Sequence, residues 1–111
     1  MKTIKIKYSN EIPKDYTGIV IWDDGDKTWY RNRKFHREDG PAYIGKKGYK
    51  SWYLNNKFIW DSDDKLDLTN QIILSKTQHP EYPTVQVWKI LGLDGLYEQI
   101  VISGMEEYII K

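Results

Sequence analysis

Residues able to carry out acid–base chemistry are few, and they gather in one short segment. Histidine occurs only at His36 and His79, and His36 is closely followed by Glu38 and Asp39. On an extended strand His36 and Glu38 would share a face, so that this imidazole beside a carboxylate could act as a general base. His79 lies in a proline-containing stretch, where we expect an exposed loop. Two histidines with scattered carboxylates do not match the ligand spacing of a metal site, and we expect no metal.

The composition excludes several other kinds of chemistry. The 111 residues include no cysteine, which rules out disulfides, thiolate zinc sites, iron–sulfur clusters and a cysteine nucleophile. No glycine-rich phosphate-binding motif is present. No apolar run approaches the roughly 18 residues of a membrane span, and no signal-peptide core follows the first residues. We expect a cofactor-free protein with no transmembrane segment, located in the cytoplasm.

Charge is distributed unevenly along the chain. The net charge is +1, but residues 1–60 carry +6 and residues 61–111 carry −5. From Lys27 to Lys57 there are nine basic residues and two acidic ones. This asymmetry predicts a basic face and an acidic face. The basic face could attract an acidic partner or a phosphate backbone, or its lysines could simply be solvated on an antiparallel sheet.

An internal repeat of 23 residues is the most specific pattern in the sequence. Residues 25–35 and 48–58 align without a gap and agree at seven of eleven positions, including a Trp-Tyr pair. In each copy a β-branched or aromatic run precedes a Gly-containing turn, a return strand and an Asn-containing turn. Each copy is therefore expected to form a β-hairpin with a connecting strand. Because one hairpin cannot bury its own apolar face, neighbouring hairpins must pair or stack.

The first copy continues into a motif that resembles a known repeat family. Residues 29–42 are similar to the tandem motif W-Y-x-N-G-K-x-H-R-E-D-G-P-A of MORN-like repeat proteins from bacteria, phages and giant viruses. The resemblance covers about residues 18–62. Two departures are that Arg33 and Asn56 stand where the motif has Gly, and that the second copy lacks the heptapeptide of residues 36–42. The resemblance implies stacked hairpins that make protein–protein contacts, dimerise or touch lipid, and that are not catalytic. It also suggests a phage accessory or host-interference factor acting in the host cytoplasm.

Structural roles are expected for the repeat positions and for the heptapeptide. The Gly-Pro pair should form a turn, the acidic pair should accept backbone N–H groups or pair with the arginine, and the His-Arg pair should tie adjacent hairpins together. This scaffolding role is preferred to catalysis by His36. The residues with expected structural roles are Gly25, Trp29, Asn32, His36, Arg37, Glu38, Asp39, Gly40, Pro41, Gly48, Trp52 and Asn55.

A surface of aromatic and basic residues is the candidate binding site. Strand alternation puts Trp and Tyr of each pair on opposite sides, so one should be buried and the other more exposed. The candidate residues are Lys27, Tyr30, Arg31, Arg33, Lys34, Lys50, Tyr53, Lys57 and Trp60. We expect a non-enzymatic protein-binding module whose partner is an acidic protein or a second copy of the chain. Single-stranded nucleic acid is the alternative, with bases stacked on the rings, and an anionic lipid surface is the third.

The rest of the chain is expected to cap the repeats. Residues 66–75 suit a short helix or a strand. Residues 84–91 and 96–103 alternate in the way that is typical of strands, which predicts a hairpin with its turn at Asp94-Gly95. Alternatively, Pro83 could start a helix over 84–91. Residues 104–110 suit a helical turn or an edge strand.

The predicted architecture is a single, mostly β domain over residues 1–111. It consists of an N-terminal strand segment (1–17), two repeats (18–62) in an antiparallel sheet of stacked hairpins, and a C-terminal segment (63–111) with a hairpin and one short helix. In the first segment Ile4, Ile6 and Tyr8 should face the core, while lysines blunt the sheet edge.

Overall fold

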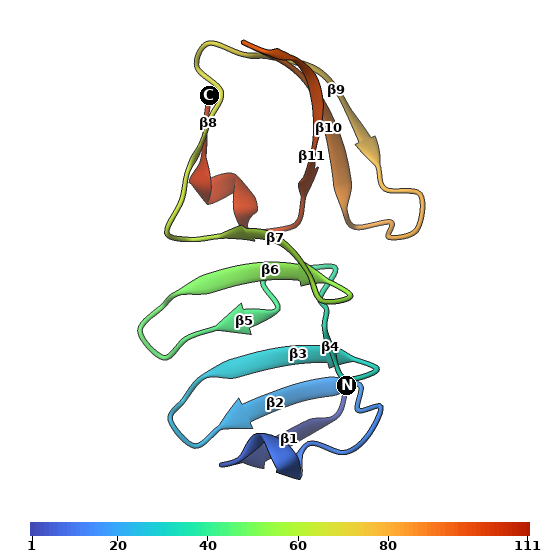
Figure 1. Ribbon diagram of the computed structural model, residues 1–111, viewed down its shortest axis with the longest axis vertical. Coiled ribbons are helices and arrows are strands. Elements are labelled where there is room, and N and C mark those ends of the chain that lie inside the picture. The colour runs from blue at the N-terminus through green and yellow to red at the C-terminus, as the bar shows by residue number, and fades with distance from the viewer. The chain divides into compact units, whose positions relative to one another are not determined.

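The computed structural model describes residues 1–111 and consists mainly of β-strands (Figure 1). Strands account for 48% of the residues and helical turns for 6%, which confirms the mostly β fold class. The chain divides into two compact units. Residues 1–37 and 41–61 form the first, called the repeat unit below, and residues 38–40 and 62–111 form the second, called the C-terminal unit. No helix has the length and hydropathy needed to span a membrane.

The repeat unit is one twisted sheet. Its strand order is β1-β2-β3-β5-β6-β7, and β4 pairs additionally with β3. All neighbours are antiparallel except β1 and β2, which run parallel. The strands are β1 (Thr3–Ile6), β2 (Gly18–Trp22), β3 (Lys27–Arg31), β4 (Lys34–Phe35), β5 (Tyr43–Ile44), β6 (Lys50–Leu54) and β7 (Lys57–Asp61).

The two sequence repeats have the same local structure. Gly25 and Gly48 both have positive φ, +99° and +95°, in the turns that precede β3 and β6. Two-residue loops then join β3 to β4 and β6 to β7. All four loop residues, Asn32, Arg33, Asn55 and Asn56, have φ between 49° and 67°. Positive φ at both central positions is the type I′ pattern that matches strand twist. Local turn chemistry therefore produces the predicted hairpins.

The Trp-Tyr pairs of the two repeats differ in burial. Trp52 is completely buried and Tyr53 half-buried, as alternation predicts, but Trp29 and Tyr30 are both half-buried. Trp29 is covered by the guanidinium of Arg37, whose central carbon lies 4.1 Å from the ring centroid. The Arg37 that covers Trp29 belongs to the heptapeptide, which the second copy lacks.

A small core lies at the β1–β2 end of the repeat unit. Tyr16 and Val20 pack with Ile6 and Ile12, and the half-buried Ile4, Trp22 and Tyr30 lie against this cluster. Strand β1 ends at Ile6, and a 3-10 turn, η1 (Ser9–Glu11), follows. Tyr8 is therefore 61% exposed and does not continue the core-facing alternation expected of it.

The C-terminal unit contains the predicted hairpin and no helix over residues 66–75. Strands β10 (Gln86–Gly92) and β11 (Gly95–Val101) pair antiparallel, and β9 (Ile72–Gln78) adds a third strand. Residues 84–91 are thus strand rather than helix. The connection between β10 and β11 centres on Leu93-Asp94, one residue before the predicted turn, because Gly92 and Gly95 still pair.

The end of the chain adopts both structures that its sequence suits. The 3-10 turn η2 (Met105–Tyr108) leads into strand β12 (Ile109–Ile110), which pairs parallel with β8 (Leu66–Asp67). These 3-10 turns are the only helical structure in the chain, so the short helix considered for residues 66–75 does not form, and those residues contain β8 and the start of β9. Buried side chains from β10, β11, η2 and the connection between β11 and η2 form the core of this unit, namely Trp88, Ile90, Val101, Ile102 and Met105.

Candidate functional site

The sheet of the repeat unit has two chemically different faces. Thr28 pairs with Tyr43, Tyr43 with Ser51 and Ser51 with Asp61, so this row and residues two positions away project to one side. We call this side the Tyr face; besides Trp22, which lies against the small core, its aromatic residues are Tyr30, Phe35, Tyr43, Tyr49, Tyr53 and Phe58. The opposite side, the Trp face, carries Lys27, Trp29, Arg31, Lys34, Lys50, Trp52, Lys57 and Trp60.

The candidate binding residues that the sequence predicted as one surface are divided between these two faces. Of the nine candidate binding residues, only Tyr30 and Tyr53 lie on the Tyr face. Arg33 occupies the β3–β4 loop, and the other six lie on the Trp face with Trp29 and Trp52. The tyrosines and the basic residues therefore project from opposite sides of the sheet. Two-residue alternation causes this separation, because Trp and Tyr are adjacent in each repeat.

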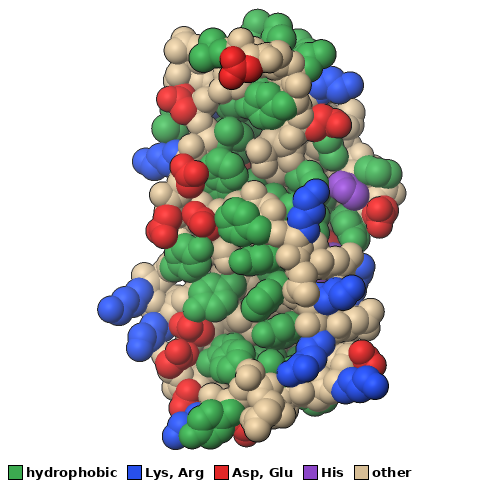
Figure 2. Space-filling view, viewed as in Figure 1, with side chains coloured by type: hydrophobic (Ala, Val, Ile, Leu, Met, Phe, Trp, Pro, Cys, Tyr) green, Lys and Arg blue, Asp and Glu red, His purple; other side chains and the backbone are tan.

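A continuous row of aromatic rings crosses the Tyr face. Tyr30 and Phe35 have ring centroids 5.2 Å apart, Phe35 and Tyr53 are also 5.2 Å apart, and Tyr53 and Phe58 are 5.6 Å apart. These spacings are typical of favourable aromatic pairs. The first three rings are half-buried, and Phe58 is 50% exposed. Figure 2 shows hydrophobic side chains gathered over the strands of the repeat unit, flanked by acidic and basic ones.

A pocket opens beside this row. It has a volume of about 260 Å³ and is lined by Phe35, Tyr43, Tyr49, Ser51 and Tyr53. Tyr43 and Tyr49 meet edge to face with centroids 5.9 Å apart. The four rings are half-buried and Ser51 is buried, so the pocket has aromatic walls and a small polar residue at its base.

Two carboxylates hold the tyrosines of the pocket. The Tyr43 hydroxyl donates to Oδ2 of Asp26 at 2.5 Å, and the Tyr49 hydroxyl donates to Oδ2 of Asp61 at 3.3 Å. Oδ1 of Asp26 also accepts the backbone N–H of Lys46 at 2.9 Å. The hydrogen bond from Tyr43, followed by that from Lys46, lowers the pKa of Asp26. The same bond to Asp26, with burial, raises the pKa of Tyr43 to about 12, so the phenol stays neutral at physiological pH.

Sequence reasoning did not select this pocket. Tyr49, Ser51 and Tyr53 follow a period of two, which is a signal that they share a face. The link from Tyr43 to Asp26 spans 17 residues and depends on how β5 pairs with β3, which the repeat pattern does not specify.

The heptapeptide connects the two repeats. Nδ1 of His36 accepts the backbone N–H of Asn55 at 3.0 Å, and the N–H of His36 donates to the carbonyl of Trp29 at 3.0 Å. The N–H of Arg37 donates to the carbonyl of Tyr53 at 3.2 Å, and its guanidinium donates to the carbonyl of Pro41 at 3.1 Å. His36 and Arg37 thus tie adjacent hairpins together, as the sequence predicted.

The central residues of the heptapeptide belong to the C-terminal unit. There the carbonyl of Glu38 accepts a hydrogen bond from the hydroxyl of Thr84 at 2.9 Å, and Gly40 is buried. His79, also in this unit, is half-buried: its Nδ1 accepts the N–H of Glu81, and its ring stacks on Tyr82 at 4.9 Å. No group of three or more His, Asp or Glu side chains is arranged to hold a metal ion.

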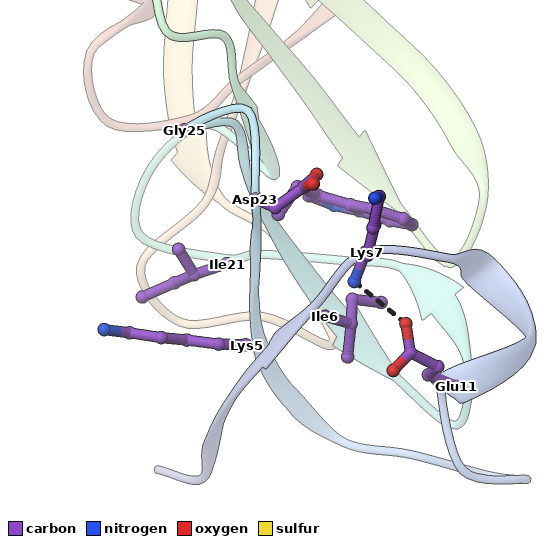
Figure 3. A pocket seen from close by; sticks show the side chains of 8 residues that line it. Lys5, Ile6, Lys7, Glu11, Ile21, Asp23 and Gly25 are labelled. Atoms are coloured by element: carbon purple, nitrogen blue, oxygen red, sulfur yellow. Dashed lines mark hydrogen bonds between the residues drawn. The ribbon is translucent and has the colours of Figure 1, made fainter.

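A second pocket of the repeat unit lies beside β1 and has mixed charge. Its volume is about 430 Å³, and its charged lining residues are Lys5, Lys7, Glu11 and Asp23. Figure 3 shows the Lys5 and Lys7 side chains pointing in different directions. Oε2 of Glu11 accepts the N–H groups of Tyr8 at 2.7 Å and Lys7 at 2.9 Å, which lowers the pKa of Glu11. This carboxylate shapes the turn at η1, and the charges do not converge on one ligand.

Comparisons with known proteins identify no relative. The chain matches no protein-family model, no curated protein and no solved structure. The resemblance to MORN-like repeats therefore remains a prediction.

Proposed function

We propose that this chain is a non-enzymatic protein-binding module that holds an extended segment of another protein along the Tyr face. The observation that carries the proposal is the continuous row Tyr30–Phe35–Tyr53–Phe58 beside a pocket. Tyr and Phe are enriched at protein interfaces because they bury a large area with little loss of side-chain entropy. A cavity of about 260 Å³ is below the usual range of roughly 300–1,000 Å³ for small-molecule sites and suits a single side chain.

The environment of His36 supports a non-enzymatic role. The side chain is 6% exposed, and its Nδ1 already accepts the N–H of Asn55. A general base needs a lone pair within reach of a substrate proton. Here Nδ1 is used for a structural hydrogen bond between hairpins.

The separation of the two faces favours a protein over nucleic acid. Binding to single strands combines exposed rings that stack on bases with basic groups that follow the phosphates. In the repeat unit the basic residues accompany Trp29 and Trp52, of which one is covered by Arg37 and the other is completely buried. Trp60 is half-buried on the same face, and the only exposed ring of the two repeats, Phe58, lies on the Tyr face.

A displayed library of random peptides tests this proposal. We expect the full chain to enrich extended peptides, and Phe58→Ala to weaken their binding, since half of the Phe58 side chain is exposed. Leu93→Ala is the matched control, because Leu93 is 85% exposed in the C-terminal unit. Unchanged circular dichroism spectra would show that both variants are folded.

Two results would contradict the proposal. One is the absence of any enriched peptide, and the other is equal binding by the Phe58→Ala and wild-type chains. Fluorescence anisotropy with a labelled single-stranded oligonucleotide at low salt tests the alternative. Association that weakens steeply with salt and is lost in Lys27→Ala would favour nucleic acid.

A further inference from the structure

We infer that the pocket between Phe35, Tyr43, Tyr49 and Tyr53 binds a cationic side chain, Arg or Lys, of the segment that lies along the Tyr face. This inference rests on the proposed function and adds the chemistry of the partner. It differs from the acidic partner that the basic residues suggest, since those residues lie on the Trp face.

Four aromatic walls make the pocket attractive to a cation. The faces of aromatic rings carry partial negative charge, and ammonium or guanidinium groups bind over them within about 6 Å of the centroid. The rings of Phe35 and Tyr53 are 5.2 Å apart, and those of Tyr43 and Tyr49 are 5.9 Å apart. All four line the same cavity, so one inserted group can contact several rings.

The carboxylates behind the tyrosines reinforce this preference. Tyr43 donates its hydroxyl proton to Asp26, and Tyr49 donates to Asp61. A phenol that donates to a carboxylate is polarised toward the anion, and its ring becomes richer in electrons. Asp26 remains ionised because its hydrogen bonds lower its pKa. A cation in the pocket would therefore meet electron-rich rings with negative charges behind two of them.

The lining contains no positive charge that would repel such a group. The five lining residues are four aromatics and a serine. Lys46 is a basic residue that contacts Asp26, to which it donates its backbone N–H. Its exposed ammonium also contributes to the lowered pKa of Asp26, so it lies close enough to affect a bound charge. Lys46 consequently provides a test of the sign of the ligand's charge.

The test is a nuclear magnetic resonance titration of the full chain with blocked arginine, N-acetyl-arginine amide. Blocked citrulline, which has nearly the same shape and no charge, is the control ligand. We expect arginine to shift the amide signals of Tyr43, Tyr49 and Ser51, and citrulline to shift them far less. Equal shifts from both ligands, or arginine shifts confined to other residues, would overturn the inference.

Charge variants sharpen the test. Asp26→Asn should weaken arginine binding about two- to fivefold, the range for an exposed charge pair. Lys46→Ala should strengthen arginine binding, because it removes a charge of the same sign as the ligand. If the pocket instead bound anions, the same variant would bind its ligand more weakly. An unchanged affinity in Asp26→Asn, or weaker binding in Lys46→Ala, would contradict a cation site.

The outcomes separate this inference from the proposed function. If the peptide library yields Phe58-dependent peptides without a preference for basic residues, and arginine does not shift the pocket signals, the cation site is wrong and the binding module stands. If arginine binds at the pocket but no peptide is enriched, the proposed function fails and the cation site stands.

Discussion

The backbone N–H of Asn55 donates a hydrogen bond of 3.0 Å to Nδ1 of His36, nineteen residues earlier in the chain. Asn55 is the first residue of the type I′ loop between β6 and β7, and His36 directly follows β4. In the first repeat the corresponding N–H, from Asn32, donates to the hydroxyl of Thr17 at 2.9 Å. The loop of each hairpin is therefore held by a side chain from the preceding segment.

Removing the His36 side chain should destabilise the repeat unit. His36→Ala leaves the N–H of Asn55 without this acceptor and creates a cavity at a side chain that is 6% exposed, so we expect a loss of about 2–3 kcal/mol. His36→Asn should lose less, because its amide oxygen can replace Nδ1. Urea denaturation measures both variants, with His79→Ala as control. Equal losses in the Ala and Asn variants would mean that the hydrogen bond contributes little.

Arg33→Gly should stabilise the chain. Arg33 has a φ of +59°, which costs about 1–2 kcal/mol for a side chain with a Cβ, while glycine loses about 0.5–1 kcal/mol of backbone entropy. Glycine also removes an exposed hydrogen bond of 3.3 Å from the Arg33 guanidinium to the carbonyl of Ser9. We therefore expect a net gain of at most about 0.5 kcal/mol in the free energy of unfolding. Arg33→Ala keeps the strain and should show no gain.

Asn56→Gly should not stabilise the chain in the same way, although Asn56 also has a positive φ, of +67°. Its Oδ1 accepts the backbone N–H of Phe35 at 2.7 Å, and glycine removes that acceptor. Thermal unfolding of the Arg33 and Asn56 variants checks the contrast. A larger gain at Asn56 than at Arg33 would contradict this explanation.

Gly18→Ala should be more damaging than Gly48→Ala. A Cβ at Gly18 would lie 2.6 Å from the carbonyl oxygen of Lys2, which accepts the N–H of Ile19 and helps hold β1 to β2. At Gly48 nothing lies within 4 Å of the added Cβ, and only the φ of +95° opposes it. We expect the free energy of unfolding to fall by about 1 kcal/mol in Gly48→Ala and by at least about 2 kcal/mol in Gly18→Ala. Chemical denaturation gives both values, and equal losses would show that the close contact with the Lys2 carbonyl does not determine the cost at Gly18.

Stability should depend on Tyr43 at alkaline pH. The folded-state pKa of Tyr43 is about 12, above the ordinary value of 10.0, chiefly because its hydroxyl donates to Asp26. The unfolded chain therefore releases this proton first. The contribution of Tyr43 is fully present below pH 10 and is lost as pH rises toward 12.

Comparison with Tyr43→Phe isolates this contribution. The difference in free energy of unfolding between wild type and variant should be constant from pH 7 to 9 and then fall. Asp26→Asn should reduce the fall, because it removes the main cause of the raised pKa. A difference that stays constant up to pH 11 would show that the Tyr43–Asp26 bond does not hold the proton.

Local patterns in the sequence were enough to predict the hairpins. Gly25 and Gly48, with the Asn-containing loops, specify turns through backbone conformations that depend mainly on neighbouring residues. Alternation likewise indicated strands over residues 84–91 and 96–103, and β10 and β11 confirm that hairpin. Residues 66–75 remained ambiguous because a short apolar run fits either period, and their structure depends on pairing with β10 and β12.

The candidate site was decided by tertiary structure. The repeat predicted which residues are equivalent, but the pairing of β5 with β3 and β6 brings Tyr43 to Asp26 and to the pocket. Alternation along each strand, which is visible in the sequence, already separates the basic residues from Tyr30 and Tyr53, although the candidate surface grouped them together. The physical reason is the separation along the sequence of the residues that interact. Turns and alternation arise from adjacent residues, whereas a pocket requires side chains brought together from distant strands. The sequence by itself thus determined the hairpins, and only the folded sheet decided which of their side chains meet.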